Sequence, residues 1–218
     1  MTRRFDVAVV DVDGTLVDTN YHHALAWFRA FRRQGMTVPV WRLHRAIGMG
    51  GDHLITEVAG ADVERRHGDD LRAAWADEFS PMLDEIRPLD GVRDLLAALR
   101  ERGLAVVLAS SGAPDHVDAY LDLFDGRALA DAWTTSEDAD RTKPEPDLIS
   151  IAVGRVAGER ALVVGDSVWD FVAATRAGYP GYAVRTGGFA AAELMDAGAR
   201  EVFDSPARLR AALDRILT

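Results

Sequence analysis

Two aspartates follow the first apolar run of the chain. Asp11 and Asp13 lie two positions apart, directly after the Val-rich segment 5–10. In an extended chain, residues i and i+2 point to the same side, so the two carboxylates can converge. Two like charges held close raise the free energy, unless a cation lies between them or one carboxylate keeps its proton. Magnesium suits such a pair because it prefers hard carboxylate oxygens, and Gly14 lets the chain turn sharply beside it.

Three later segments carry polar residues where strands are expected to end. In open parallel sheets, ligands bind at the carboxyl ends of the strands, so these residues are expected to gather near Asp11. Carboxylates, hydroxyls and an ammonium at one edge are the groups that a magnesium ion and a phosphate ester require. The residues are Ser110, Ser111 and Gly112 after the second strand, Lys143 after the third, and Asp166 and Asp170 after the fourth.

Each of these segments also has a purely structural explanation. Ser110 suits the start of a helix, while Asp166 and Asp170 suit a first helical turn, where carboxylates interact favourably with the helix dipole. A solvated loop is the usual place for a lysine such as Lys143. The string Asp-x-Asp-Gly is also typical of a strand followed by a turn. Only the combination of all four segments, in this order, favours a catalytic site over these structural explanations.

Lys143 is the single lysine among 25 basic residues, and the other 24 are arginines. Chance survival of one lysine is the simple explanation. Its place in one of the four polar segments weakens that explanation and favours a site that needs a lysine. Lys143–Pro144 is also a candidate cis peptide bond, because cis bonds are almost confined to X–Pro pairs.

The segment 18–87 has only helical patterns. Apolar residues recur at helical spacing, and no alternating pattern typical of a strand occurs between Thr19 and Pro88. Helices are expected from about residue 20 to before Gly35, at 39–47, at 53–59 and at 62–86. We therefore expect an all-helical domain in this part of the chain.

After Pro88, helices alternate with short apolar strands. Strands are expected at 104–109, 131–135, 161–165, 181–184 and 201–203. Helices are expected at 91–100, 114–122, 147–157, 168–177, 189–197 and from Pro206 onward. Such alternation is typical of a parallel, doubly wound sheet. The predicted fold is α/β: a Rossmann-like core of residues 1–17 and 88–218, with an all-helical cap domain at 18–87 inserted after the first motif.

Composition excludes several classes of partner and chemistry. A formal net charge of −10 argues against nucleic acid or an anionic membrane surface as a partner. The chain has no cysteine, which excludes disulfides and thiolate catalysis. The residues before Asp11 contain no long apolar stretch, and no segment is apolar enough to span a bilayer. We therefore expect no signal peptide and a cytoplasmic location.

The string from Asp11 to Thr19, D-V-D-G-T-L-V-D-T, resembles the first motif of the haloacid dehalogenase-like hydrolases. It is most similar to the branch of helical-cap phosphatases that contains phosphoglycolate phosphatases and β-phosphoglucomutase. The order acidic pair, serine, lysine and second acidic pair matches the four motifs of this family. The resemblance covers residues 5–17 and 88–185. The cap matches mainly in its position and helical character.

This resemblance implies a role for each polar segment. Asp11 would be the nucleophile that becomes phosphorylated, and Asp13 the general acid and base. Asp13 would offer the metal its backbone carbonyl, and Asp170 would bind it directly or through a water. The implied phosphate ligands are Ser110, Ser111, Gly112 and Lys143. The implied ligands of Mg²⁺ are Asp11, Asp13, Asp166 and Asp170.

In this family the cap is a lid that excludes water and contacts the leaving group. His23 and Trp27 lie four residues apart on one helix face, and β-phosphoglucomutase has a His and a Trp at matching positions. Arg45 is a candidate cationic contact. Gly50 and Gly51 stand where the mutase has a basic residue for a second phosphate, which counts against a mutase. Packing within the cap explains His23 and Trp27 equally well.

The expected function is magnesium-dependent hydrolysis of a small phosphate monoester, of the phosphoglycolate or sugar-phosphate type, through an aspartyl-phosphate. The expected partner is a small phosphorylated metabolite, and the protein a monomer or homodimer. A β-phosphoglucomutase-like phosphotransferase is one alternative. A haloacid dehalogenase is another, although those enzymes lack an acid at the position of Asp13 and need no metal. A third is a non-enzymatic phospho-acceptor or binding protein. Receiver domains of response regulators are of that kind, but they are shorter and have no helical insertion.

Overall fold

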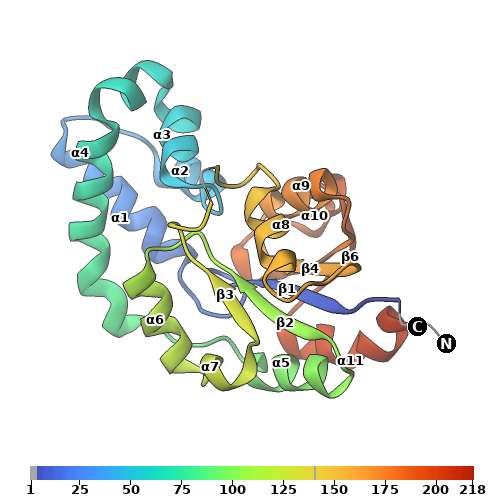
Figure 1. The fold of residues 1–218 in the computed structure, drawn as a ribbon. Helices are drawn as coiled ribbons and strands as arrows, with labels where there is room; N and C mark the ends of the chain where they lie inside the picture. Colours follow the sequence, from blue (N-terminus) through green and yellow to red (C-terminus); the bar gives the residue numbers. More distant parts are fainter. Residues whose placement is uncertain (1–3, 140) are drawn as a thin grey trace. The chain divides into compact units, whose positions relative to one another are not determined.

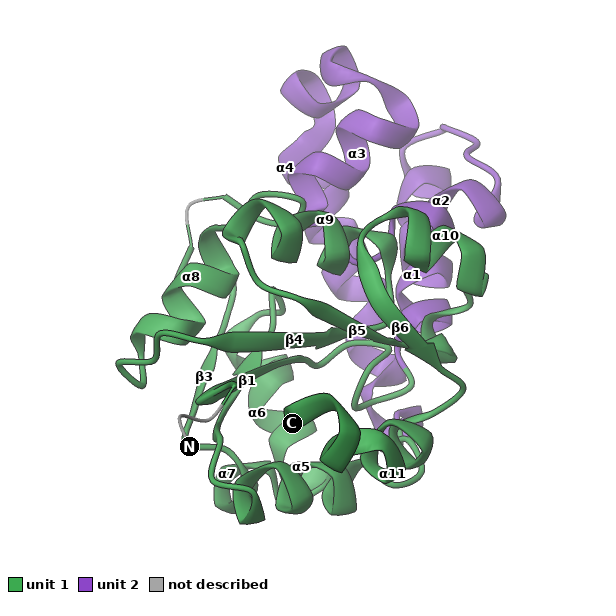
Figure 2. Cartoon of the chain, turned by 90° about the vertical axis from the view of Figure 1, so that its right-hand side faces the viewer, with its two compact units in different colours: residues 1–18, 87–218 green, residues 19–86 purple. Residues whose placement is uncertain are grey.

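The computed structural model describes residues 4–139 and 141–218, and Figure 1 shows its helices and strands. The chain divides into two compact units (Figure 2). Unit 1 comprises Met1–Asp18 and Arg87–Thr218, and unit 2 comprises Thr19–Ile86. The chain therefore leaves unit 1 just after the first acidic motif and returns to it at Arg87.

Unit 1 is organised around a six-stranded sheet in which all paired strands are parallel. Its strands are β1 (Val7–Asp11), β2 (Ala105–Ala109), β3 (Ala132–Thr134), β4 (Ala161–Gly165), β5 (Gly181–Val184) and β6 (Ala199–Phe203). Their order across the sheet is β3-β2-β1-β4-β5-β6. The predicted doubly wound, parallel α/β sheet is confirmed. The order reverses next to β1, and such a reversal is where ligands bind in open sheets of this kind.

Helices cover both faces of this sheet. Helices α8 and α9 lie on one face, and α5 and α11 on the other (Figure 2). The helices of unit 1 are α5 (Val92–Glu101), α6 (Pro114–Leu123), α7 (Gly126–Leu129), α8 (Asp147–Gly154), α9 (Val168–Ala177), α10 (Ala191–Asp196) and α11 (Pro206–Leu217), with a 3₁₀ turn η2 (Arg185–Gly187). A strand covered on both faces is apolar throughout rather than alternating. All five residues of β1 are accordingly buried, including Asp11.

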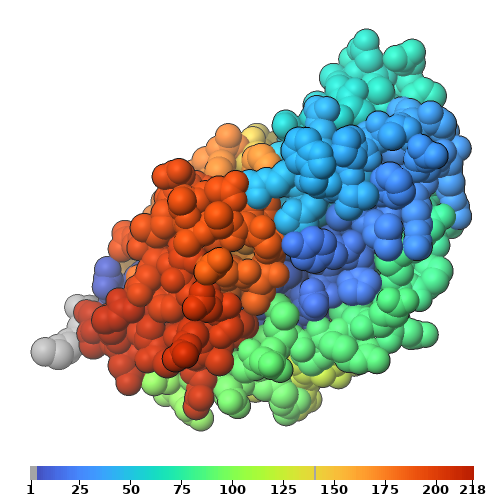
Figure 3. Space-filling view, turned by 180° about the vertical axis from the view of Figure 1, so that it is seen from behind, coloured from blue at the N-terminus to red at the C-terminus, as the bar shows by residue number. Residues whose placement is uncertain are grey.

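Surface helices of unit 1 are amphipathic. In the space-filling view, α11 forms part of the red surface (Figure 3), while its Leu209, Leu213 and Ile216 are buried. Its N-terminus is capped by Ser205, whose side chain accepts the Arg208 N–H at 3.3 Å. Across the described residues, we find no helix with both the length and the apolar character needed to cross a membrane.

Unit 2 contains helices only, as its sequence predicts. They are α1 (Asn20–Arg33), α2 (Val40–Ala46), α3 (Gly51–Ala59) and α4 (Ala61–Phe79), followed by the 3₁₀ helix η1 (Ser80–Glu85). Buried aliphatic and aromatic side chains from all four α-helices form one apolar core. Unit 2 therefore has a core of its own, independent of the sheet.

An aromatic cluster connects α1 to α4 within this core. The ring of His23 stacks on Phe79, with 4.1 Å between centroids, and on Trp75, with 5.6 Å. Trp27 stacks on Trp75 at 5.6 Å and is only 4% exposed. Trp27 therefore belongs to the apolar core of unit 2.

Element ends differ from prediction in a few places. The helix expected at 62–86 ends at Phe79 and continues as a 3₁₀ helix. Pro81 is the second residue of this 3₁₀ helix, and proline lacks the N–H that an α-helix uses. The short helix α7 has four residues and was not predicted, because a single turn has no periodicity to detect. The helix expected at 147–157 ends at Gly154.

Two tryptophans of unit 2 provide a matched test of this packing. Trp27→Ala should lower the free energy of unfolding by about 3–5 kcal/mol, because it leaves a cavity among stacked rings. Trp41 is 69% exposed, so Trp41→Ala should change it by less than about 0.5 kcal/mol. Urea denaturation followed by circular dichroism measures both. Equal losses would contradict the assignment of Trp27 to the core.

Candidate active site

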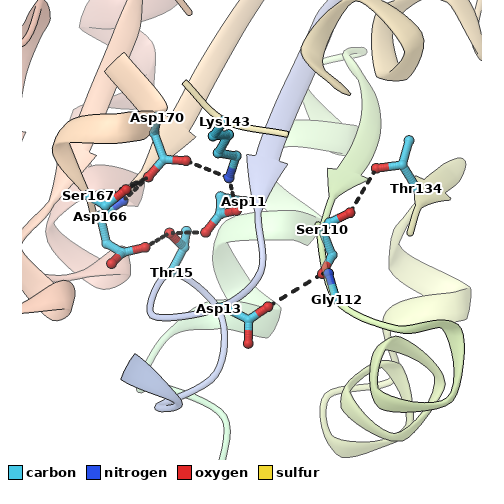
Figure 4. Close-up of polar contacts among 10 residues, drawn as sticks. All are labelled: Asp11, Asp13, Thr15, Ser110, Gly112, Thr134, Lys143, Asp166, Ser167 and Asp170. Carbon is cyan, nitrogen blue, oxygen red and sulfur yellow. Dashed lines mark hydrogen bonds and ion pairs between the residues drawn. The ribbon is translucent and has the colours of Figure 1, made fainter. Parts of the chain in front are cut away.

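The register of the sheet brings three of the four polar segments together. Asp11 ends β1 and pairs with Ala109 of β2, so Ser110 lies one residue beyond it on the neighbouring strand. On the other side of β1, Val164 of β4 is in register with the residue before Asp11, so Asp166 also follows closely. Figure 4 shows these side chains at the strand ends. Their proximity follows from parallel pairing alone.

Lys143 reaches this edge from the loop between β3 and α8. Its Nζ forms ion pairs with Asp11 Oδ1 and with Asp170 Oδ1, the latter at 2.6 Å (Figure 4). Lys143 is 3% exposed, and Asp11 and Asp170 are 7% and 1% exposed. An ammonium removed from water needs such partners, because burial without them is strongly unfavourable. Lys143 is therefore not a solvated loop lysine, and its peptide bond to Pro144 is cis.

Burial and charge act on these groups in opposite directions. Burial raises the pKa of Asp11 to about 7, although the Lys143 ammonium lowers it and the Asp170 and Asp13 carboxylates add to the rise. Burial alone lowers the pKa of Lys143, but Asp11 and Asp170 outweigh it and leave this pKa raised. Lys143 therefore stays an ammonium at neutral pH. Asp11 needs positive charge close by to be fully ionised there.

Asp170 caps the N-terminus of α9 in addition to pairing with Lys143. Its Oδ2 accepts hydrogen bonds from Ser167 N–H at 3.0 Å and from Ser167 Oγ at 2.7 Å, which forms a capping box. Gly165 makes room for it, since a Cβ there would lie 2.5 Å from Asp170 Cγ. Asp170 therefore caps the first turn of α9 and also belongs to the candidate site, so both explanations given from the sequence apply.

Thr15 joins the first and fourth segments, and sequence reasoning gave it no role. Its buried Oγ1 lies 2.6 Å from Asp166 Oδ1 and 3.3 Å from Asp11 Oδ2 (Figure 4). A hydroxyl has one proton to donate, so the shorter contact identifies Asp166 as its main acceptor. The one feature of the sequence that could have indicated Thr15 is its hydroxyl within the first acidic motif, four residues after Asp11. Thr15 therefore fixes the position of one carboxylate relative to the other.

Three of these carboxylates form a group that fits a divalent cation. Asp11, Asp166 and Asp170 are all buried and each offers one oxygen, and these oxygens lie within 4.8 Å of one another. Hard oxygen donors of this kind match the preference of magnesium. The group contains no carboxylate oxygen of Asp13. Like charges this close favour a cation, and the single ammonium of Lys143 offsets only part of them.

The Asp13 carboxylate faces hydroxyl groups instead. Ser110 Oγ lies 3.4 Å from Asp13 Oδ2 and itself accepts the Gly112 N–H at 2.9 Å. Ser110 is buried, whereas Ser111 and Gly112 are half-buried. On α6, the Tyr120 hydroxyl is buried as well, and burial, followed by the charge of Asp13, raises its pKa. The two aspartates of the first motif therefore occupy different environments, one among charges and one among hydroxyls.

The three residues expected to contact a leaving group belong to unit 2. His23 and Trp27 lie in the aromatic cluster described above, and Arg45 is half-buried in α2. Gly51 opens α3 beside Trp27, where a Cβ would lie 3.2 Å from the indole. Contact of these residues with a substrate stays a prediction.

Comparison with known proteins matches this architecture to a family. The family model described as haloacid dehalogenase-like hydrolase matches residues 5–178. Validoxylamine A 7'-phosphate phosphatase of Streptomyces hygroscopicus subsp. limoneus is 30% identical over 181 residues, which cover 80% of this chain and 83% of that protein. Phosphoglycolate phosphatase of Caulobacter vibrioides is 28% identical, covering 81% and 78%. A hydrolase from Pseudomonas syringae has a similar structure, with a TM-score of 0.91, 29% identity and coverage of 97% and 99%.

Proposed function

Because the chain belongs to the haloacid dehalogenase-like hydrolase family, we propose that it is a magnesium-dependent phosphatase acting through an aspartyl-phosphate. Its substrate is a small phosphate monoester, a class supported by relatives named for validoxylamine 7'-phosphate and phosphoglycolate. The observation that carries the proposal is the buried ammonium of Lys143 on Asp11, beside a three-carboxylate group. Such a site offers both a nucleophile and the positive charge that a phosphate requires.

Asp11 is the proposed nucleophile. One carboxylate oxygen attacks phosphorus in line, forming an acyl phosphate while the bond to the ester oxygen breaks. Lys143 reduces the repulsion between the carboxylate and the phosphate, and it lowers the pKa of Asp11, which burial raises to about 7. Asp11, Asp166, Asp170 and the Asp13 backbone carbonyl would hold magnesium, which supplies further positive charge when bound.

Asp13 is the proposed acid and base. It gives its proton to the departing ester oxygen, so the leaving group departs as an alcohol. It then takes a proton from the water that attacks the phosphoenzyme, and phosphate and free Asp11 result. Its place outside the three-carboxylate group and beside the Ser110 hydroxyl supports this assignment. Ser110, Ser111, Gly112 and Lys143 are the proposed ligands of the transferring phosphoryl group.

Unit 2 is proposed to act as the cap domain. An insertion between the first motif and the rest of the catalytic unit lets one domain carry out the chemistry and the other select the leaving group. His23, Trp27 and Arg45 are its proposed substrate contacts. Because Trp27 is 4% exposed and His23 stacks on Phe79, half-buried Arg45 is the better position for a change of substrate preference without loss of fold.

Metal-dependent hydrolysis is the first expected result. Purified protein should hydrolyse p-nitrophenyl phosphate with Mg²⁺, EDTA should abolish turnover, and excess Mg²⁺ should restore it, because the buried carboxylates need a divalent cation. Release of nitrophenol measures all three. Full activity in EDTA would exclude the metal assignment. Turnover of a haloacid without phosphatase activity would support the dehalogenase alternative.

Substitutions of the two aspartates of the first motif should impair different steps of the reaction. Asp11→Asn should abolish the phosphoenzyme because the nucleophile is lost. Asp13→Asn should keep the nucleophile and slow turnover by about 10²–10⁴-fold, the usual contribution of one proton transfer. Mass spectrometry after reaction with an acyl phosphate donor locates the adduct. A label on Asp13, or unchanged turnover in Asp13→Asn, would reverse or reject these roles.

Lysine should not be replaceable at position 143. Lys143 places a compact charge between two buried carboxylates, and the planar fork of arginine is larger and differently shaped. Lys143→Arg should lower kcat/KM by about 10²-fold or more, comparable to the loss of one preorganised electrostatic donor. Arg210→Lys is the control, since its side chain is 52% exposed. A folded Lys143→Arg enzyme with wild-type kcat/KM would remove Lys143 from the phosphate site.

A further inference from the structure

The turn that follows β5 packs against two segments of the candidate metal site. This turn, 185–188, lies in unit 1 and includes the 3₁₀ turn η2. No polar motif in the sequence distinguishes it, and the roles assigned above do not involve it. Its two inner residues, Thr186 and Gly187, contact the first and fourth polar segments.

Gly187 is buried directly against Asp166. A Cβ at this position would overlap Asp166 Oδ2 and would lie 2.8 Å from both Asp166 Cγ and the Asp166 backbone oxygen. Rotation of the carboxylate alone cannot relieve this overlap, because the backbone oxygen is also too close. Asp166 Oδ1 is held at 2.6 Å by the Thr15 hydroxyl. A methyl group at 187 would therefore displace Asp166 or the turn itself.

Thr186 holds the other segment. Its Oγ1 donates a hydrogen bond to the Gly14 carbonyl oxygen at 2.5 Å. Gly14 has a left-handed backbone, with φ of 76°, and stands between Asp13 and Thr15. This hydrogen bond thus fixes the loop that carries the Asp13 backbone carbonyl on one side and Thr15 on the other.

We propose that Thr186 and Gly187 are positioning residues for the metal site. Gly187 leaves the space that the Asp166 carboxylate occupies, and Thr186 holds the loop after Asp11 in register with it. Magnesium requires near-ideal octahedral geometry with oxygens at about 2.0–2.1 Å, so small displacements of its ligands weaken binding. The inference rests on the proposed function, because it takes Asp166 and the Asp13 carbonyl as magnesium ligands.

Four variants test it by metal binding rather than by turnover. Isothermal titration with Mg²⁺ should give an affinity at least about 10-fold weaker for Gly187→Ala than for wild type, as is usual when support of a ligand is lost. Gly154→Ala is the matched control, since a Cβ there has no neighbour within 4 Å. Thr186→Val should weaken binding several-fold, because it removes the hydroxyl and keeps the shape. Thr186→Ser should bind as wild type.

Thermal melts with and without Mg²⁺ separate positioning from packing. A ligand that binds the native state alone raises the melting temperature, so weaker binding should reduce this magnesium-dependent rise in Gly187→Ala and Thr186→Val. An unchanged rise, with a melting temperature lowered equally in both conditions, would mean a purely structural role and overturn the proposal. If Gly187→Ala does not fold, wild-type Mg²⁺ affinity in Thr186→Val overturns it instead. A wild-type protein that neither binds Mg²⁺ nor hydrolyses phosphate esters would overturn the proposed function as well.

Discussion

The ammonium of Lys143 between Asp11 and Asp170 is the interaction on which the site depends. It connects the end of β1, the loop after β3 and the start of α9. Buried ion pairs contribute little net stability, since desolvation of both charges offsets their attraction. A protein gains little fold stability from placing several carboxylates around one ammonium in its interior. We therefore attribute this arrangement to the proposed chemistry, in which the attacking carboxylate and the arriving phosphate would both need that charge.

Much of this arrangement could be predicted from sequence, for a definite physical reason. The alternation of apolar strands and helices predicted a parallel sheet, and parallel strands share the edge at which they end. Asp11 ends such a strand, and Ser110 and Asp166 each directly follow one, so their proximity needed no knowledge of side-chain packing. Lys143 was predicted from its place in one of the four polar segments together with its identity as the single lysine of the chain. That it is buried could not be predicted, because loops of this length have no periodicity.

The remaining features depend on contacts between residues far apart in the chain. Thr15 meets Asp166 across 151 positions, and Thr186 meets Gly14 across 172. A threonine or a glycine is common in loops, so neither pattern distinguishes these residues from ordinary turn residues. His23 and Trp27 show the converse limit. Their helical spacing correctly placed them on one face, but it could not separate contact with a substrate from packing on Trp75.

Two glycines show how the carboxylates of the site are held. Gly165 lies against Asp170 and Gly187 against Asp166, each so closely that a methyl group would overlap the carboxyl group or its backbone. Two acidic side chains thus pack against bare backbone on one side and are hydrogen-bonded by Ser167 or Thr15 on the other. These contacts restrict where both carboxyl groups can lie within the folded chain. Preorganisation of this kind lowers the entropy cost of binding a cation, and it accounts for small residues beside the charged ones.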